Sequence, residues 1–461
     1  MNRRWLALAG CLLLILQTGV VFAMTVNVFG PYSPEPSGPR SHDVVFYAEN
    51  QPNFLFDHGS SVVITCQSIK RPQHLTWSLS RNLIRTPFLS GEADPRLDDS
   101  FRLEVPTAAL RPGFYELHVK LIYTATQSAE AVTAFGWKIN EEPVITYVPR
   151  DFMEFWQGEL KKMADVPLDL KIEKVGVLSD AEVCKYNLEH ASLVEYPDPA
   201  GEKVKEVELY KVNFAGANGT RVYAWVAKPV GPGPFPTMLV LPGAGTGPRP
   251  QPLEHARHGY VAMEVQMHNQ PVDMAREKYP PTTADDYSGP RTLDEYHVYL
   301  NAVRAVTAIC ACPGADPSRL VTMGGSQGGR LSIVVPALCP QVKATIPHIA
   351  HFAYMPWLRW TERMNLAKES GEAGFTAKDL LRNDQTRAEG YFDILNFAPY
   401  IKCPVYMDSG LIDGASPPTG CFAVYRALNC PKTMSPLPNK AHDNSPCFDR
   451  AAWRWLDKLL K

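Results

Sequence analysis

The sequence has little net charge, and this absence removes two classes of partner. The 461 residues include 46 basic and 48 acidic side chains, which leaves a formal net charge of −2 at pH 7. Binding to nucleic acid or to an anionic membrane surface needs a clustered excess of Lys and Arg. We therefore expect no nucleic-acid partner and no electrostatic attachment to a membrane.

The sequence also lacks a regular cysteine pattern. Its ten cysteines form no Cys-X-X-Cys pair and no evenly spaced framework. Cys11 lies in an N-terminal apolar run, so an odd number remains after that run and at least one thiol must be unpaired. Export would permit disulfides, but the spacing specifies none. Cys310 and Cys312 lie in an apolar helical run, and we interpret them as packing residues.

A long apolar run occurs at the N-terminus, from Trp5 to Phe22. It follows two arginines and ends in a small residue before Met24, which is the pattern of a secretory signal peptide. We predict that residues 1–23 are removed and that the mature protein is secreted or periplasmic, without a membrane anchor. Two alternatives stay open, namely lipidation at Cys11 and an uncleaved anchor helix.

The N-terminal part of the mature chain predicts a β-sandwich. The chain is 45% hydrophobic and 20% charged, and its length indicates two domains. Residues 30–40 are rich in Pro, Gly and Ser and predict a tether. Segments with period-two alternation follow and predict an antiparallel sandwich over residues 24–145. These segments are 60–66, 75–80, 101–105, 114–123 and 131–139.

Three residues of this region resemble the immunoglobulin pattern. Cys66 precedes Trp77, and Tyr115 has the setting of a tyrosine corner. The second cysteine of the pattern would fall where the chain has Leu117. We therefore predict an immunoglobulin-like sandwich without its disulfide, although any other small sandwich fits as well. We expect this domain to be accessory, so that a chain starting near Tyr147 would fold without it.

Residues 146–461 alternate between strand and helix patterns. They predict an α/β-hydrolase domain with an about eight-stranded, mostly parallel sheet. The strand candidates are 207–216, 221–230, 236–242, 260–266, 319–324, 342–348, 404–409 and 432–437. The main helix candidates are 293–310, 328–338, 418–428 and 448–460.

A serine framed by glycines lies between one of these strands and one of these helices. The stretch reads GGSQG over residues 324–328, with Ser326 at its centre. A serine at a strand-to-helix junction of this kind predicts a nucleophile elbow rather than a flexible loop. Gly324 and Gly328 leave room for the strained turn, and the helix N-terminus favours negative charge. The backbone N–H of Gln327 is expected to form half of an oxyanion hole.

A serine hydroxyl needs a base that accepts its proton and a carboxylate that orients the base. In this fold the three follow in the order Ser, Asp or Glu, His. Asp413 and His442 both follow strand candidates and are predicted to complete the triad. Asp408 is a rival carboxylate, but it lies at the strand end itself. No histidine other than His442 follows His351, so the base has little competition.

His348 and His351 have an i, i+3 spacing that two metal ligands could have. No carboxylate cluster accompanies them, so we expect them to line the pocket instead. The sequence implies no metal and no organic cofactor.

Taken together, these segments resemble the acetylxylan esterase and cephalosporin-C deacetylase family, carbohydrate esterase family seven. The resemblance covers about residues 148–461. It implies that Ser326, Asp413 and His442 are the triad and that the backbone amides of Ala244 and Gln327 are the oxyanion donors. The segments that carry it are 149–162, 296–306, 324–329 and 391–418.

The sequence departs from that family in three places. The family's Arg-Gly-Gln motif appears as residues 268–270, His-Asn-Gln, and the segment that follows looks short, so the oligomeric state is left open. The carboxylate after the catalytic histidine is Asp443. A family tyrosine is replaced by Ala244, which keeps the amide but lacks the ring. We expect a wider acyl preference unless Tyr354 or Trp357 fills the space.

The sequence as a whole predicts a secreted serine esterase that cleaves short-acyl esters. Acetyl groups on sugars, such as acetylated xylan or xylo-oligosaccharides, are the substrates we expect. One alternative is a broader carboxylesterase or a peptidase on the same fold. The other is an inactive carbohydrate-binding protein. The natural sugar and the role of the sandwich do not follow from the sequence.

Overall fold

The computed structural model describes residues 44–96, 100–190, 201, 203–279, 286–370 and 384–460. The predicted signal peptide, Cys11 and the Pro-rich tether lie outside these residues. Every helix within them is too short or too polar to cross a lipid bilayer.

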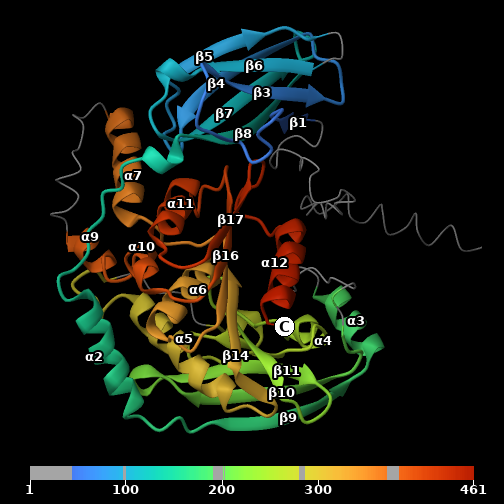
Figure 1. Ribbon diagram of the computed structural model, residues 1–461, viewed down its shortest axis with the longest axis vertical. Helices are drawn as coiled ribbons and strands as arrows, with labels where there is room; N and C mark the ends of the chain where they lie inside the picture. Colours follow the sequence, from blue (N-terminus) through green and yellow to red (C-terminus); the bar gives the residue numbers. More distant parts are fainter. Residues whose placement is uncertain are drawn as a thin grey trace, which may run out of the picture. The chain divides into compact units, whose positions relative to one another are not determined.

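Eight strands form two sheets in the N-terminal part, which is blue to cyan in Figure 1. The strands are β1 (Val44–Tyr47), β2 (Leu55–Phe56), β3 (Ser61–Ser68), β4 (His74–Arg81), β5 (Leu89–Ala93), β6 (Ser100–Pro106), β7 (Gly113–Ile122) and β8 (Ser128–Trp137). One sheet has the order β1-β3-β6 and the other has the order β2-β8-β7-β4-β5. All five predicted strands are present, whereas β1, β2 and β5 were not predicted.

Alternate side chains of these strands are buried between the sheets. Along β4, for example, Leu75, Trp77 and Leu79 belong to one core cluster. Tyr115 Oη donates a 2.6 Å hydrogen bond to the carbonyl of Arg111, as a tyrosine corner does. The immunoglobulin likeness itself stays a prediction.

The cysteines of the described residues carry no disulfide. Cys66 is fully buried in the N-terminal core, and burial raises the pKa of its thiol to about 12. It therefore behaves as a small apolar side chain rather than as a reactive thiol.

Nine strands form the C-terminal sheet, one more than predicted. They are β9 (Lys171–Leu178), β10 (Val207–Ala215), β11 (Arg221–Pro229), β12 (Phe235–Val240), β13 (Val261–Gln266), β14 (Ala315–Gly325), β15 (Ala344–His348), β16 (Val405–Gly410) and β17 (Lys432–Leu437). The order is β17-β16-β15-β14-β12-β13-β11-β10-β9, and the pairs from β17 to β13 are parallel. The eight predicted strands are confirmed. The unpredicted β9 is an edge strand that is mostly exposed, so burial leaves no alternating pattern in its sequence.

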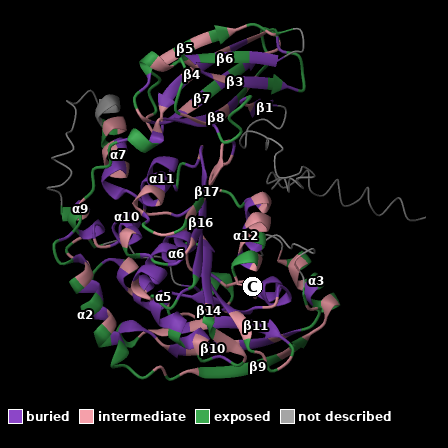
Figure 2. Cartoon of the chain, in the orientation of Figure 1, coloured by how far each residue is buried: buried purple, intermediate pink, exposed green. Residues whose placement is uncertain are grey.

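Helices cover both faces of this sheet. They are α2 (Phe152–Ala164), α3 (Asp180–Glu189), α4 (Leu253–Arg257), α5 (Asp294–Cys310), α6 (Gln327–Leu338), α7 (Met355–Ser370), α9 (Asp384–Glu389), α10 (Ile394–Phe397), α11 (Pro418–Ala427) and α12 (Pro446–Leu459). One core cluster joins the strands to α2, α5, α6, α10 and α11, and a second joins them to α12. Figure 2 shows that β16 and α6 are almost entirely buried, and residues 320–324 of β14 are buried as well. The four main predicted helices are confirmed.

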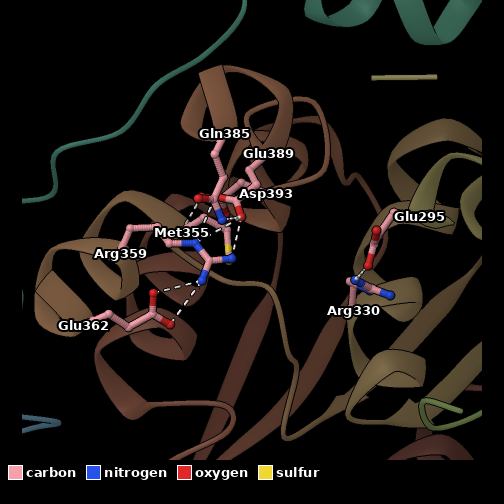
Figure 3. Close-up of polar contacts among 8 residues, drawn as sticks. All are labelled: Glu295, Arg330, Met355, Arg359, Glu362, Gln385, Glu389 and Asp393. Carbon is pink, nitrogen blue, oxygen red and sulfur yellow. Dashed lines mark hydrogen bonds and ion pairs between the residues drawn. The ribbon is translucent and has the colours of Figure 1, made fainter. Parts of the chain in front are cut away.

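A network of buried charges connects α7 with the segment before β16 (Figure 3). The Arg359 guanidinium donates to Glu389, with Nε and Oε1 3.0 Å apart, and Glu389 is fully buried. Asp393 accepts the backbone N–H of Tyr354 at 2.9 Å and of Met355 at 2.7 Å. These bonds fix the chain that follows β15.

The core of the N-terminal sheets includes side chains from the C-terminal part of the chain. Leu411 and Phe422 are buried in that core cluster. The ring centroids of Phe422 and Phe114 are 4.9 Å apart. Thr133 Oγ1 in β8 donates a buried 2.8 Å hydrogen bond to Asn439 Oδ1. Leu411 and Asn439 precede Asp413 and His442 by two and three residues respectively, so the N-terminal sheets support the loops of both.

The predicted domain boundary between residues 145 and 146 lies in coil before α2 and stays a prediction. The shared core changes what we expect of a chain that starts at Tyr147. Leu411 and Phe422 would become exposed, and each side chain contributes about 1.5–3 kcal/mol when buried. We predict a lower melting temperature and a lower turnover than in the full chain. Thermal unfolding and an ester assay test this prediction. It would be contradicted if the shortened chain and the full chain had equal melting temperatures and equal turnover.

Candidate active site

Ser326 lies between β14 and α6 in a strained backbone conformation. Its φ is 58° and its ψ is −112°. Residues with a side chain seldom adopt positive φ, and strain of this kind collects at functional sites. The N–H of Ser326 donates to the carbonyl of His348 at 3.0 Å, and its own carbonyl accepts from the N–H of His351 at 3.2 Å. The peptide groups on both sides of Ser326 are therefore fixed.

Two glycines let the chain after β12 lie directly against this turn. A Cβ on Gly328 would lie 1.9 Å from the carbonyl oxygen of Leu241, and a Cβ on Gly324 would lie 2.2 Å from the same atom. No side chain fits at these distances. The sequence predicted room for the turn at these glycines, and the structure shows that the Leu241 carbonyl occupies it.

Ser326, His442 and Asp413 form a continuous chain of hydrogen bonds. His442 Nε2 is 2.9 Å from Ser326 Oγ, and His442 Nδ1 is 2.8 Å from Asp413 Oδ2. Asp413 is fully buried, and its Oδ1 accepts the backbone N–H of Ala415 at 2.8 Å and of Ser416 at 2.7 Å. The carboxylate is thus held with Oδ2 toward the imidazole. A proton on Nδ1 leaves Nε2 able to accept the proton of the serine.

The rival carboxylate, Asp408, pairs with a different histidine. Its Oδ2 is 2.6 Å from His348 Nδ1, and its Oδ1 accepts the N–H of Ile349 at 2.8 Å. The His348 ring stacks on Phe448 with centroids 5.1 Å apart. Asp408 therefore joins the end of β16 to the end of β15, whereas Asp413 reaches His442.

The two histidines considered as metal ligands have other contacts. Both were predicted to line the pocket; His348 lines the catalytic cavity, whereas His351 is not among the residues that line it. Burial, with a smaller effect of the Arg330 charge, lowers the pKa of His351 to about 3, so this ring is neutral at pH 7. Nowhere in the described ranges do three His, Cys, Asp or Glu side chains gather as a metal site would need.

A buried cation fixes the first turn of α6. Arg330 Nη2 donates to the side-chain oxygen of Gln327 at 3.2 Å, and Nη1 donates to Glu295 of α5 at 3.1 Å. Figure 3 shows the pair of Arg330 and Glu295. The guanidinium also lies over the rings of Phe352 and Tyr299, 5.1 Å and 5.4 Å from their centroids. Sequence reasoning missed the contacts of Arg330 with Glu295, Phe352 and Tyr299 because they join residues that are distant in the chain.

A cavity of 420 Å³ opens at Ser326 and His442. Its walls include the loop that follows β12, with Ala244 at its exposed tip. Gly243 lies beside the elbow, because a Cβ on it would be 4.0 Å from the Gly325 carbonyl oxygen. The backbone amides of Ala244 and Gln327 thus flank the serine, and their role as oxyanion donors stays a prediction.

Comparisons with known proteins find similarity to acetyl xylan esterases and an acetyl esterase. The model of the acetyl xylan esterase (AXE1) family matches residues 187–459. The acetyl esterase Axe7A of Xylanibacter ruminicola is 27% identical over 327 residues, which are 68% of each chain. The acetyl xylan esterase from Paenibacillus sp. R4 superposes with a TM-score of 0.52 at 23% identity, over 69% of this chain and 97% of that one. Acetyl xylan esterase 1 from Thermoanaerobacterium sp. JW/SL YS485 gives 0.53 at 20% identity, over 70% and 98%.

The hydrogen-bonded chain from Ser326 to Asp413 predicts how much each triad variant lowers kcat. Because the triad acts as a unit, Ser326→Ala and His442→Ala should each lower kcat by about 10⁴–10⁶-fold, and Asp413→Asn should cost less. Asp408→Asn is the matched control, since it removes a buried carboxylate that does not contact His442. This variant should have a lower melting temperature than the wild type, while its kcat should fall far less than that of Ser326→Ala or His442→Ala. Steady-state kinetics on folded variants decide, and near-normal turnover of Ser326→Ala would refute the assignment.

Proposed function

Because this chain belongs to the acetyl xylan esterase family and is a carboxylic ester hydrolase, we propose that Ser326 is its nucleophile and that its substrates are acetylated sugars. The observation that carries the proposal is the hydrogen-bonded chain from Ser326 Oγ through His442 to Asp413, which begins at the wall of an open cavity. Acetylated xylan and xylo-oligosaccharides are the substrate class we put first.

The proposed reaction proceeds through an acyl-enzyme. Ser326 Oγ attacks the ester carbonyl carbon while His442 Nε2 accepts its proton. The carbonyl oxygen becomes an oxyanion that accepts hydrogen bonds from the amides of Ala244 and Gln327. His442 then donates its proton to the departing sugar hydroxyl, and the acetyl group stays on Ser326. A water molecule, deprotonated by His442, attacks the acyl carbon and releases acetate and the free serine.

Each protein group has a defined task in these steps. Asp413 keeps the imidazole in the productive tautomer and stabilises the imidazolium that forms twice in the cycle. The α6 N-terminus and the amide of Gln327 favour negative charge beside Ser326. The neutral ring of His351 adds no competing charge next to His442.

We also propose that the protein is exported. The support is the N-terminal sequence alone, in which two arginines precede an apolar run that is followed by a small residue. Acetylated polysaccharide lies outside the cell, so an exported esterase would meet it there.

Acetate release decides between the candidate functions. Acetylated xylan, acetylated xylo-oligosaccharides and a β-lactam acetyl ester should be assayed side by side with peptide and long-acyl substrates. We expect acetate from the sugar esters at a higher kcat/KM than any long-acyl product. Peptide cleavage without acetate release would favour the peptidase alternative, and no turnover at all would favour an inactive carbohydrate-binding protein.

The acyl side of the cavity is expected to tolerate more than an acetyl group. Ala244 has no ring to close the cavity, and its side chain is exposed. Tyr354 and Trp357, which were considered as replacements for that ring, line a different cavity of 360 Å³. Tyr354 Oη accepts the N–H of Ile145 at 2.8 Å, which directs it toward that second cavity.

We predict a shallow dependence of kcat/KM on acyl length from acetyl to butyryl. Each further methylene of the acyl chain that becomes buried contributes about 0.8 kcal/mol. An open pocket gains this contribution, whereas a closed pocket would exclude the longer chain. Ala244→Tyr should restore a steep preference for acetyl esters while keeping the backbone amide. A steep fall beyond acetyl in both proteins would mean that the pocket is closed by other residues.

A further inference from the structure

We infer that Arg249 is a positioning residue for the oxyanion hole, and this inference rests on the proposed function. Arg249 follows the loop that carries Ala244, and its guanidinium turns back onto that loop. Nη1 donates to the carbonyl of Gly243 at 3.3 Å, and Nη2 donates to the carbonyl of Gly245 at 2.6 Å. The two carbonyls lie on either side of Ala244.

The first of these bonds sets the direction of the Ala244 N–H. A peptide group is planar, and in the trans form its C=O and N–H point in opposite directions. The peptide bond between Gly243 and Ala244 is trans, since the cis bond found in the described chain joins Gly233 and Pro234. The carbonyl of Gly243 and the N–H of Ala244 belong to this one plane. A guanidinium fixed on the carbonyl therefore directs the N–H to the opposite side.

The loop is rich in glycine, and Gln266 Nε2 holds its far end through a 2.6 Å hydrogen bond to the carbonyl of Gly247. Residues 243–247 read Gly-Ala-Gly-Thr-Gly, and glycine has the greatest backbone freedom of any residue. Gly245 has a φ of +98°, and a Cβ built on it would meet no atom within 4 Å. No neighbour packs against the Cβ position of Gly245, whereas the two carbonyl bonds from Arg249 restrain the chain on both sides of Ala244.

Arg249 is itself well anchored. Its backbone N–H donates to the carbonyl of Val272 at 2.9 Å. Burial lowers the pKa of the guanidinium, and the nearby Glu264 carboxylate opposes that shift. An arginine nonetheless stays charged at neutral pH. Its charge-assisted hydrogen bonds are about twice as strong as neutral ones, and they polarise the peptide so that the Ala244 N–H becomes a better donor.

The second donor needs no such support. Gln327 is the first residue of α6, and its amide is placed by the helix and by the close contact of Gly324 and Gly328 with Leu241. Loss of Arg249 should therefore loosen one donor and leave the other unchanged. Removing one oxyanion donor outright lowers kcat by about 10²–10³-fold. A donor that is present but mobile should cost less, and we expect Arg249→Met to lower kcat by about 10–100-fold.

The test combines steady-state kinetics with a mimic of the oxyanion. Full-length protein and Arg249→Met are assayed on p-nitrophenyl acetate and inhibited with a short trifluoromethyl ketone, which adds to the serine and forms a tetrahedral oxyanion. The affinity for the ketone should fall by the same factor as kcat/KM, while KM changes little. Arg249→Lys, which keeps the charge but loses the forked pair of donors, should be intermediate. Free guanidinium ion should restore part of the activity of Arg249→Met.

Arg319→Met is the matched control. Arg319 Nη2 also donates to a backbone carbonyl, that of Pro234 at 3.1 Å, but Arg319 is not among the residues that line the catalytic cavity. Its kcat should stay within about threefold of the wild type, because solvent screens the attraction between an exposed charge and the site. An equal loss in both variants would show that the effect is not specific to the loop of Ala244, and would overturn the positioning role.

The rate of phosphonylation of Ser326 by a fluorophosphonate separates this inference from the proposed function. Failure of the wild type to react would count against the proposed nucleophile. Reaction of the wild type and of Arg249→Met at the same rate, with equal kcat and equal ketone affinity, would overturn the role of Arg249 alone. The role of Arg249 would also be overturned if Arg249→Met had a lower melting temperature and a lower kcat but an unchanged affinity for the ketone.

Discussion

The hydrogen bond of 2.9 Å between Ser326 Oγ and His442 Nε2 joins residues that are 116 positions apart in the chain. A serine hydroxyl is a weak nucleophile without a base, so the proposed chemistry requires this contact. The bond forms because parallel strands end at the same edge of a sheet. β14, β16 and β17 present their carboxyl ends together, and Ser326, Asp413 and His442 follow those three ends.

Each of the three loops is held by contacts outside the triad. The elbow is fixed by the approach of the Leu241 carbonyl to Gly324 and Gly328. The loop of Asp413 begins at Leu411, whose side chain is buried in the core of the N-terminal sheets. The loop of His442 is tied to β8 through Asn439. The N-terminal sheets are thus part of the support of the acid and the base, which gives them a structural task besides any contact with substrate.

Sequence patterns predicted the parts of the structure that are set by local periodicity. β10 to β16 were predicted because each contains several buried, β-forming residues, and the GGSQG stretch was recognised at a strand-to-helix junction. The edge strand β9 was missed, because an exposed strand carries no burial pattern. β1 and β2 were missed because they are only four and two residues long.

The site was predictable only as far as chain order allowed. The order Ser, Asp, His selected Asp413 and His442, and the structure places both within hydrogen-bonding distance of one another. No pattern could reveal that Arg249 donates to the carbonyls beside Ala244, or that Glu295 neutralises Arg330. Such contacts depend on how distant segments pack. The entry of Leu411 into the N-terminal core was equally invisible in the sequence.

The central claim is that Ser326 is a nucleophile activated by His442. Peptide mapping by mass spectrometry after treatment with a fluorophosphonate tests it most directly. We predict one phosphonyl adduct on Ser326, formed in step with the loss of esterase activity and strongly slowed in His442→Ala. An adduct on another residue, or full loss of activity without an adduct on Ser326, would contradict the account.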